Sequence, residues 1–192
     1  MNSILTKKFP KSIVIDGINY GINADFRNCL IIILAFEDDE LSLEDKYEIL
    51  LLRLYKKVPK NIEQAIENGI YFLDCNNYVN LKNNDEVKKR LYSFSNDGAR
   101  IYSAINQTNH IDLEAIEFLH WWKFVFLFMD INKDCIFSQL LSFRKKIQDG
   151  KLTPDEKKTY LEMRELIDLD YNSDEEENSE FMNLWNGGDN KE

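Results

Sequence analysis

The segment from Leu113 to Met129 constrains the fold more than any other part of this sequence, because it is apolar on almost every side. When the segment is projected on a helix, two largely aromatic groups lie on different faces and leave only a narrow polar strip. One face holds Phe118, Trp122, Val125 and Met129, and another holds Trp121, Phe124 and Phe128. A helix of this kind must either lie at the centre of a core or bury its second face in another protein chain.

Two interpretations of this aromatic helix remain open from the sequence. The adjacent residues Trp121 and Trp122 can each face a different layer of one domain, and this central-core interpretation is favoured. In the alternative, self-association or binding of a client protein covers one of the faces. The candidate protein-binding residues on this helix are Phe118, Trp121, Trp122 and Phe128.

The rest of the chain predicts a mainly α-helical domain with a small N-terminal β-hairpin. Residues 12–22 contain two short β-branched runs around Asp16-Gly17, a dipeptide that supports the positive φ angles of a type I′ turn. After this hairpin, apolar residues recur at helical spacing, which predicts a single domain of about six to seven helices over residues 1–167. The expected helix starts are Asp25, Ser42, Asn61, Asp97, Leu113, Asn132 or Asp134, and Thr153.

The negative charge of the chain is concentrated at its C-terminal end. The formal net charge is −10, of which residues 1–167 carry −2 and residues 168–192 carry −8. The acidic block and the Gly187-Gly188 pair cannot bury enough surface to offset the loss of chain entropy on folding. We therefore predict that residues 168–192 form a flexible acidic tail.

One short apolar segment interrupts this acidic tail. Phe181, Leu184 and Trp185 would share one face if the segment were helical. The segment is a candidate to dock in the groove of a partner protein, and the alternatives are a free tail or one that folds back on the domain.

The sequence contains no motif that supports catalysis or cofactor binding. Its two histidines, His110 and His120, have no metal-binding spacing. A histidine such as His120, flanked by Leu119 and Trp121, is more often a satisfied core or edge residue than a catalytic base. No glycine-rich phosphate loop occurs. We therefore expect no enzymatic activity, no cofactor and no metal site.

Composition and segment length predict a cytosolic protein. Cys29, Cys75 and Cys135 are far apart and odd in number, which favours buried, reduced thiols. The most apolar stretch, residues 119–129, is far shorter than the ~20 residues of a membrane span. The first residues lack the apolar run of a signal peptide. The acidic excess disfavours nucleic acid as a partner, and no membrane partner is expected.

Several segments that are far apart in the chain resemble one known family. They are Phe9-Pro10, Ile13–Arg27, Leu52–Tyr55 followed by Pro59 and Ala65-Ile66, Ile111–Leu113, Leu119–Phe124 and Phe143–Lys146. In these segments the chain resembles the bacteriophage gene-product-fifteen family, found in tailed phages of Gram-positive hosts and in their prophages. The resemblance extends over residues 5–165, and the run Leu-His-Trp-Trp-Lys-Phe is its most specific part.

The resemblance implies a role in phage tail assembly. Genes of this family usually lie beside the gene for the tape-measure protein, which implies a tail assembly chaperone that keeps the tape-measure protein soluble. The expected partners are the tape-measure protein and, secondarily, the tail-tube protein, with self-association as a further option. The expected location is the cytoplasm of the bacterial host. The alternative is a structural tail or neck component that remains in the virion.

Overall fold

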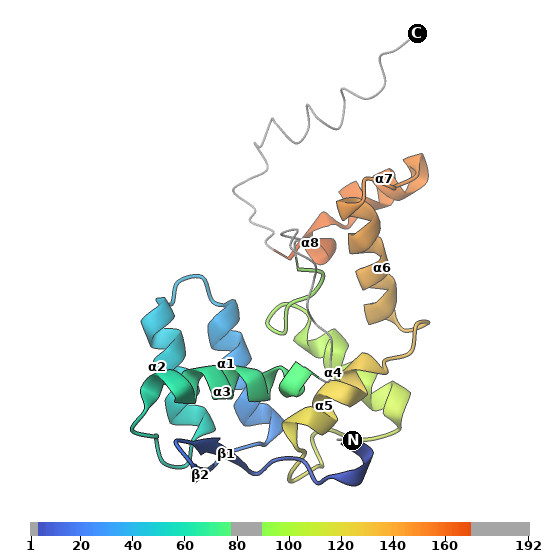
Figure 1. Ribbon diagram of the computed structural model, residues 1–192. Helices are drawn as coiled ribbons and strands as arrows, with labels where there is room; N and C mark the ends of the chain where they lie inside the picture. The colour runs from blue at the N-terminus through green and yellow to red at the C-terminus, as the bar shows by residue number, and fades with distance from the viewer. Residues whose placement is uncertain (1–3, 78–89, 170–192) are drawn as a thin grey trace. The chain divides into compact units, whose positions relative to one another are not determined.

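The fold is mainly helical and carries an N-terminal β-hairpin, as predicted (Figure 1). The computed structural model describes residues 4–77 and 90–169. The chain divides into two compact units, Met1–Leu141 and Ser142–Glu192, and the division falls within α6. In chain order the described elements are η1 (Ile4–Thr6), β1 (Ser12–Ile15), β2 (Ile18–Gly21), α1 (Phe26–Glu37), α2 (Leu43–Leu54), α3 (Ile62–Leu73), η2 (Cys75–Asn77), α4 (Gly98–Asn109), α5 (Trp121–Met129), α6 (Ile136–Gln148), α7 (Pro154–Glu162) and α8 (Arg164–Ile167).

The β-hairpin forms as predicted and lies on α3. Asp16 and Gly17 adopt positive φ angles of 49° and 77°, as a type I′ turn between β1 and β2 requires. The Gln64 side chain accepts a hydrogen bond from the Asp16 N–H at 2.8 Å, and the Asn68 amide donates to the Val14 carbonyl at 3.2 Å. A two-stranded hairpin is marginal in water by itself, so α3 supplies the surface that it needs.

Side-chain caps fix the starts of the first three helices. Asp25 Oδ1 accepts a hydrogen bond from the first turn of α1 at 3.0 Å. Ser42 and Asp45 form a capping box at the start of α2, and Asn61 Oδ1 accepts a hydrogen bond from the first turn of α3 at 3.2 Å. These caps satisfy backbone N–H groups that have no partner within their helix. The predicted starts of α1, α2 and α3 are therefore confirmed.

α3 packs closely on α2 at a glycine, and α1 and α2 run side by side (Figure 1). A Cβ atom added at Gly69 would lie 2.8 Å from Leu50 Cδ2 and 3.2 Å from Leu54 Cδ2. Both leucines are fully buried. Glycine at this position therefore permits an approach of the two helices that a larger residue would prevent.

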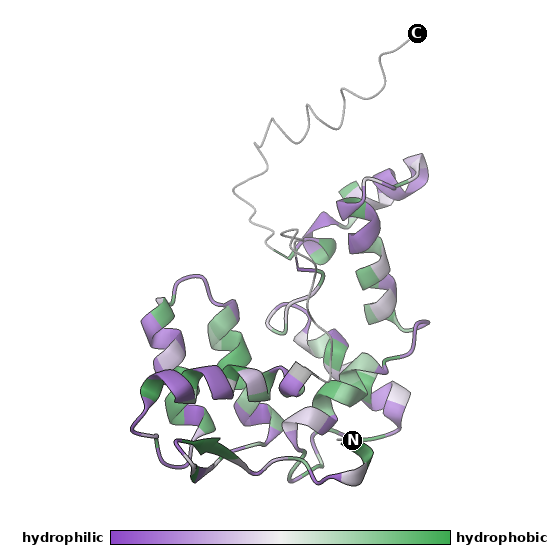
Figure 2. Cartoon of the chain, in the orientation of Figure 1, coloured by the Kyte–Doolittle hydropathy of each residue, from purple (hydrophilic) through white to green (hydrophobic). Residues whose placement is uncertain are grey.

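α5 belongs to the core of the first unit. Trp121, Trp122 and Phe124 are all buried, and the Phe124 ring stacks on the Phe26 ring of α1 with 4.8 Å between the ring centroids. Figure 2 shows α5 as hydrophobic over most of its length. Packing against α1 and α4 therefore covers much of this aromatic helix within the same unit.

The aromatic helix is shorter than predicted, because it does not begin at Leu113. α5 begins at Trp121, and residues 111–120 form turns and irregular backbone. The carbonyls of Leu113 and Ile116 accept hydrogen bonds from Arg27 Nη2 at 2.8 and 2.7 Å. Helical periodicity could not reveal this contact, because Arg27 is more than eighty residues away in the chain.

Two carboxylates from distant positions hold the turn before α4. Glu37 Oε2 accepts a hydrogen bond from Ser93 Oγ at 2.8 Å, and Asp97 Oδ2 accepts one from the Ser93 N–H at 3.2 Å. Asp97 is fully buried and precedes α4, which therefore begins where the sequence predicted. Ser93 in this way connects the end of α1 to the start of α4.

The second unit contains the last turns of α6 together with α7 and α8. Thr153, the predicted start of the helix, forms a capping box with Glu156 at the start of α7. The helix expected after Thr153 is divided at Met163, which gives eight α-helices among the described residues. Arg144 is buried, and its Nε donates a hydrogen bond to the Ile167 carbonyl at 2.6 Å.

The predicted division into a domain over residues 1–167 and an acidic tail over residues 168–192 stays a prediction. Residues 170–192 lie outside the described residues. The candidate partner-binding residues Phe181, Leu184 and Trp185 therefore lie outside them too.

Replacing the glycine at the contact between α2 and α3 should destabilise the first unit. Gly69→Ala places a methyl group against the buried side chain of Leu50, and overpacking of this kind costs ~1–3 kcal/mol of unfolding free energy. Gly98→Ala is the matched control, because no atom lies within 4 Å of a Cβ at that helical position. Urea denaturation followed by circular dichroism measures both variants. Equal stability of the two variants would contradict the close approach at Gly69.

Candidate functional site

The N-terminal ends of α1 and α5 are joined by a short stretch of antiparallel backbone pairing. The Phe26 N–H donates to the Leu119 carbonyl at 2.8 Å, and the Trp121 N–H donates to the Ala24 carbonyl at 2.7 Å. The Asp25 carboxylate, which also caps α1, accepts a hydrogen bond from the Leu119 N–H at 3.1 Å. This helix-start junction (residues 24–26 with 119–121) fixes the direction in which both helices leave it.

Two adjacent tryptophans connect this junction to the end of α3. Trp121 Nε1 donates a hydrogen bond to the Leu73 carbonyl at 2.8 Å, and Trp122 Nε1 donates to the Phe72 carbonyl at 2.9 Å. The last four carbonyls of a helix have no partner within it, and those buried away from water need another donor. The indole N–H groups supply such donors to two of these carbonyls.

His120, between Leu119 and the tryptophans, caps α5 in its neutral form. Its Nδ1 accepts a hydrogen bond from the Trp122 N–H at 3.1 Å. The ring proton therefore lies on Nε2, which donates to the Pro10 carbonyl at 2.9 Å. Burial lowers the pKa of His120, the contact with Pro10 acts in the opposite direction, and the charge of Lys11 lowers it further. The prediction that His120 is a satisfied core or edge residue is confirmed.

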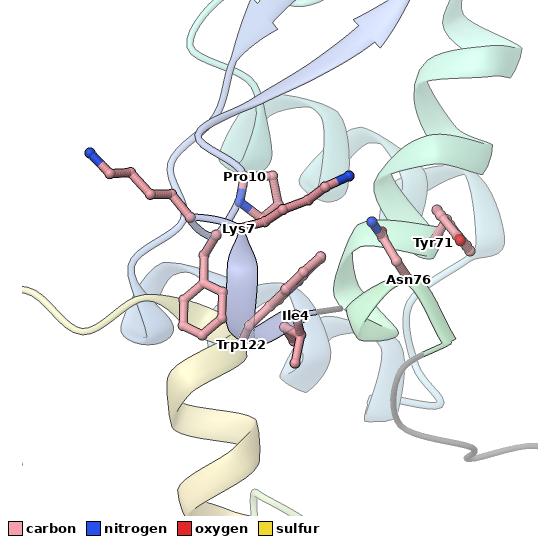
Figure 3. A pocket seen from close by; sticks show the side chains of 8 residues that line it. Ile4, Lys7, Pro10, Tyr71, Asn76 and Trp122 are labelled. Carbon is pink, nitrogen blue, oxygen red and sulfur yellow. The ribbon is translucent and has the colours of Figure 1, made fainter. Parts of the chain in front are cut away.

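The surface beside these residues carries a groove of about 330 Å³, which we call the N-terminal groove. Ile4, Lys7, Lys8, Phe9 and Pro10 form one side, Tyr71 and Asn76 form the other, and Trp122 lies between them. Figure 3 shows Ile4, Lys7, Pro10 and Trp122 facing the side chains that come from α3 and η2. The groove therefore combines aromatic and aliphatic surface with two lysines.

A second hollow of about 250 Å³ adjoins the N-terminal groove along β1. It shares Pro10, Tyr71 and Asn76 with the first hollow and continues past Ile13 and Val14. The two hollows are therefore adjacent and lie between the N-terminal segment and α3.

The predicted protein-binding residues occupy different environments. Trp121 is buried away from the groove, while Trp122 is 4% exposed and contributes to its lining. Phe128 is partly buried against Tyr92, with 5.1 Å between the ring centroids. Phe118 is exposed and lies in the irregular segment before α5. Of these four candidates, the structure brings only Trp122 to the groove.

Several groove residues were not predicted from the sequence. Tyr71 is 45% exposed and lies beside the apolar stripe of α3, so helical periodicity gave it no role. Lys7 and Lys8 belong to an N-terminal segment without a regular pattern. Phe9 belongs to one of the segments that resemble the family, and this resemblance is the sequence signal that could have pointed to it as a functional residue. Its ring centroid lies 5.9 Å from that of Trp122.

The three cysteine thiols differ in burial. Cys29 and Cys75 are buried, as predicted, whereas Cys135 is only partly buried. Burial raises the pKa of both buried thiols, that of Cys75 to about 12, so they stay protonated at neutral pH. Over residues 4–77 and 90–169, no group of three or more His, Cys, Asp and Glu side chains is placed to hold a metal ion.

None of the helices in the described part of the chain has the length and apolarity that a membrane crossing requires.

The fold and the groove define a small, mainly helical protein with an apolar depression bordered by lysines. A family model described as "Bacteriophage Gp15 protein" matches residues 5–169, so the chain belongs to the bacteriophage Gp15 protein family. The resemblance seen in the sequence is thereby confirmed, and the chain is a phage protein. Searches of curated proteins and of solved structures find no match.

Removing the indole donor of Trp121 should destabilise the first unit. Trp121→Phe keeps an aromatic ring but leaves the Leu73 carbonyl with only the weak Cys75 thiol donor at 4.0 Å, and the loss of the indole bond costs ~1–3 kcal/mol of unfolding free energy. Tyr102→Phe is the control, because it removes a hydrogen bond from an exposed hydroxyl to Asp112. Urea denaturation should show the larger loss in the tryptophan variant, and equal losses would refute the structural role of this indole.

The unfolding free energy should fall as the pH drops below about 6.5, the ordinary pKa of histidine. The folded protein keeps His120 neutral with a lowered pKa, so the unfolded chain binds a proton first and is favoured as the pH falls. This contribution is fully present above pH ~6.5 and is lost between that pH and the lower pKa of the folded state.

Histidine variants test the source of this pH dependence. His120→Asn retains a side-chain oxygen for capping but does not titrate, so its denaturation midpoint should change less between pH 7 and 5 than that of the unaltered protein. His110→Asn is the matched control at an exposed position with a φ of 52°, which asparagine tolerates. Identical pH profiles for the His120 variant and the unaltered protein would assign the effect to other groups.

Proposed function

We propose that this phage protein is a tail assembly chaperone that binds the tape-measure protein and keeps it soluble before the tail-tube subunits enclose it. The observation that carries the proposal is the open, partly aromatic N-terminal groove on a member of a phage family. Three of its residues, Phe9, Pro10 and Trp122, belong to the segments that resemble this family. The role is one of binding and needs no catalytic group or cofactor.

The physical properties of the groove suit the capture of an aggregation-prone chain. Amphipathic segments of an unassembled client expose apolar side chains, and these gain free energy when they leave water for an apolar depression. Trp122 is mostly covered by its neighbours, whereas Tyr71 is almost half exposed and remains accessible to a client. The negative charge of the whole chain, −10, favours solubility of the resulting complex.

The proposed partners follow from this role. The tape-measure protein is the client, the tail-tube protein is a second contact during handover, and the site of action is the cytoplasm of the bacterial host. Neither nucleic acid nor a membrane takes part. Self-association of this protein remains compatible with the proposal.

Co-expression with the tape-measure protein of the same phage tests the proposal. The soluble fraction of the tape-measure protein should rise severalfold when this chain is present. Tyr71→Ser should reduce that gain, because it removes an aromatic ring from the groove. Leu52→Ser is the matched control, since Leu52 is 62% exposed on α2 and does not line the groove.

The result that would overturn the proposal is equal solubility of the tape-measure protein with and without this chain. Mass spectrometry of purified virions separates the chaperone from the alternative, a structural tail or neck component. A chaperone is absent from finished particles, whereas a structural component is present in a fixed number of copies.

A further inference from the structure

The charge of the N-terminal groove is opposite to that of the chain as a whole. Its described lining includes Lys7 and Lys8 but no carboxylate, although the complete sequence has a net charge of −10. Both lysine side chains are exposed at the edge of the groove. A local positive field in this position attracts anionic groups and disfavours cationic ones.

Two of the three aromatic side chains in the groove, those of Phe9 and Trp122, offer a ligand no hydrogen-bonding group, whereas Tyr71 also carries a hydroxyl. The indole N–H of Trp122 already donates to the Phe72 carbonyl, so Trp122 offers a ligand only its ring. Phe9 and Ile4 add further apolar surface on the same side. An occupant must therefore bring apolar side chains to the hollows and place its charges at the edge.

We propose that the N-terminal groove binds an acidic amphipathic segment of a partner protein. Aromatic or aliphatic side chains of that segment enter the two hollows, which share Pro10, Tyr71 and Asn76. Carboxylates on its flanks lie against Lys7 and Lys8. This inference deepens the proposed function. It rests on that function only where it identifies the partner as the client protein in tail assembly.

A peptide segment fits these observations better than a nucleic acid. A protein that binds double-stranded DNA strongly contacts about six to ten phosphates, and the described lining of the groove supplies two lysines. Residues 1–167 carry a net charge of −2, so no excess of positive charge in the body supports a longer phosphate track. The hollows, in contrast, have the size of side chains.

Fluorescence anisotropy with the purified full chain tests the inference. The probe is a labelled peptide of about 12 residues with one tryptophan and two leucines at helical spacing and four glutamates. Two further probes are the same peptide with glutamine at each glutamate position and a short oligothymidylate. The acidic peptide should bind at least about fivefold more tightly than its glutamine counterpart, and this ratio should shrink as salt is added.

Variants locate the binding site. The double change Lys7→Glu with Lys8→Glu should weaken binding of the acidic peptide about tenfold, a loss that corresponds to about 1.4 kcal/mol, and should affect the glutamine peptide little. Lys57→Glu with Lys60→Glu is the matched control, because it makes the same change in net charge at exposed positions away from the groove. Tyr71→Ser should weaken both peptides.

Three results would overturn the inference. They are failure of the acidic peptide to bind, equal losses in the two double-lysine variants, and tighter binding of the oligothymidylate than of the acidic peptide. The last result would make the groove a nucleic-acid surface. Because the assay contains no tape-measure protein, its outcome is independent of the co-expression experiment. If the acidic peptide binds but the tape-measure protein is not solubilised, the groove is a binding site for a different partner.

Discussion

The two indole–carbonyl hydrogen bonds at the end of α3 are the interaction on which the first unit most depends. A buried helix end leaves carbonyl groups without partners, and each unsatisfied carbonyl costs ~1–3 kcal/mol, which is a large part of the stability of a small domain. Trp121 and Trp122 donate to two carbonyls of this helix end from the first turn of α5, and the other donors to them are the Asp74 N–H for Phe72 and the Cys75 thiol for Leu73. α3 also holds the hairpin and packs on α2. The two indole bonds therefore determine how α5 packs against the group formed by α2, α3 and the hairpin.

The same interaction explains why the most specific sequence run of the family has an unusual composition. In Leu-His-Trp-Trp, the leucine backbone pairs with the start of α1, the histidine caps α5 and contacts the N-terminal segment, and the tryptophans reach α3. The histidine and the two tryptophans contribute side-chain donors and acceptors that other residues would not place in the same way, whereas the leucine contributes its backbone groups. The residues of this junction lie within the segments that resemble the family, whereas Lys7, Lys8 and Tyr71 of the groove lie outside those segments.

Local interactions were predictable from the sequence, and distant ones were not. The turn at Asp16-Gly17 and the helix start at Ser42 depend on residues a few positions apart, and both were expected. The start of α5 at Trp121 depends on the pairing of residues 24–26 with 119–121, so periodicity alone placed it too early. The groove was missed for the same reason, because its two sides come from residues 4–10 and 71–76 and meet only in the folded chain.

Anchoring of the Trp122 ring has a consequence for binding. Its N–H bond to the Phe72 carbonyl and its contacts with Phe9 and Phe72 hold the ring in one place, with 5.9 and 5.8 Å between the respective ring centroids. A ligand that meets a fixed ring does not have to order it, and this preorganisation lowers the entropic cost of binding. Lys7 and Lys8 are exposed, and charges at the edge of a site contribute more to the choice and approach of a charged partner than to the strength of the final contact. Affinity and selectivity in the groove therefore depend on different residues, and a substitution at a lysine can change the partner without disturbing the junction beneath it.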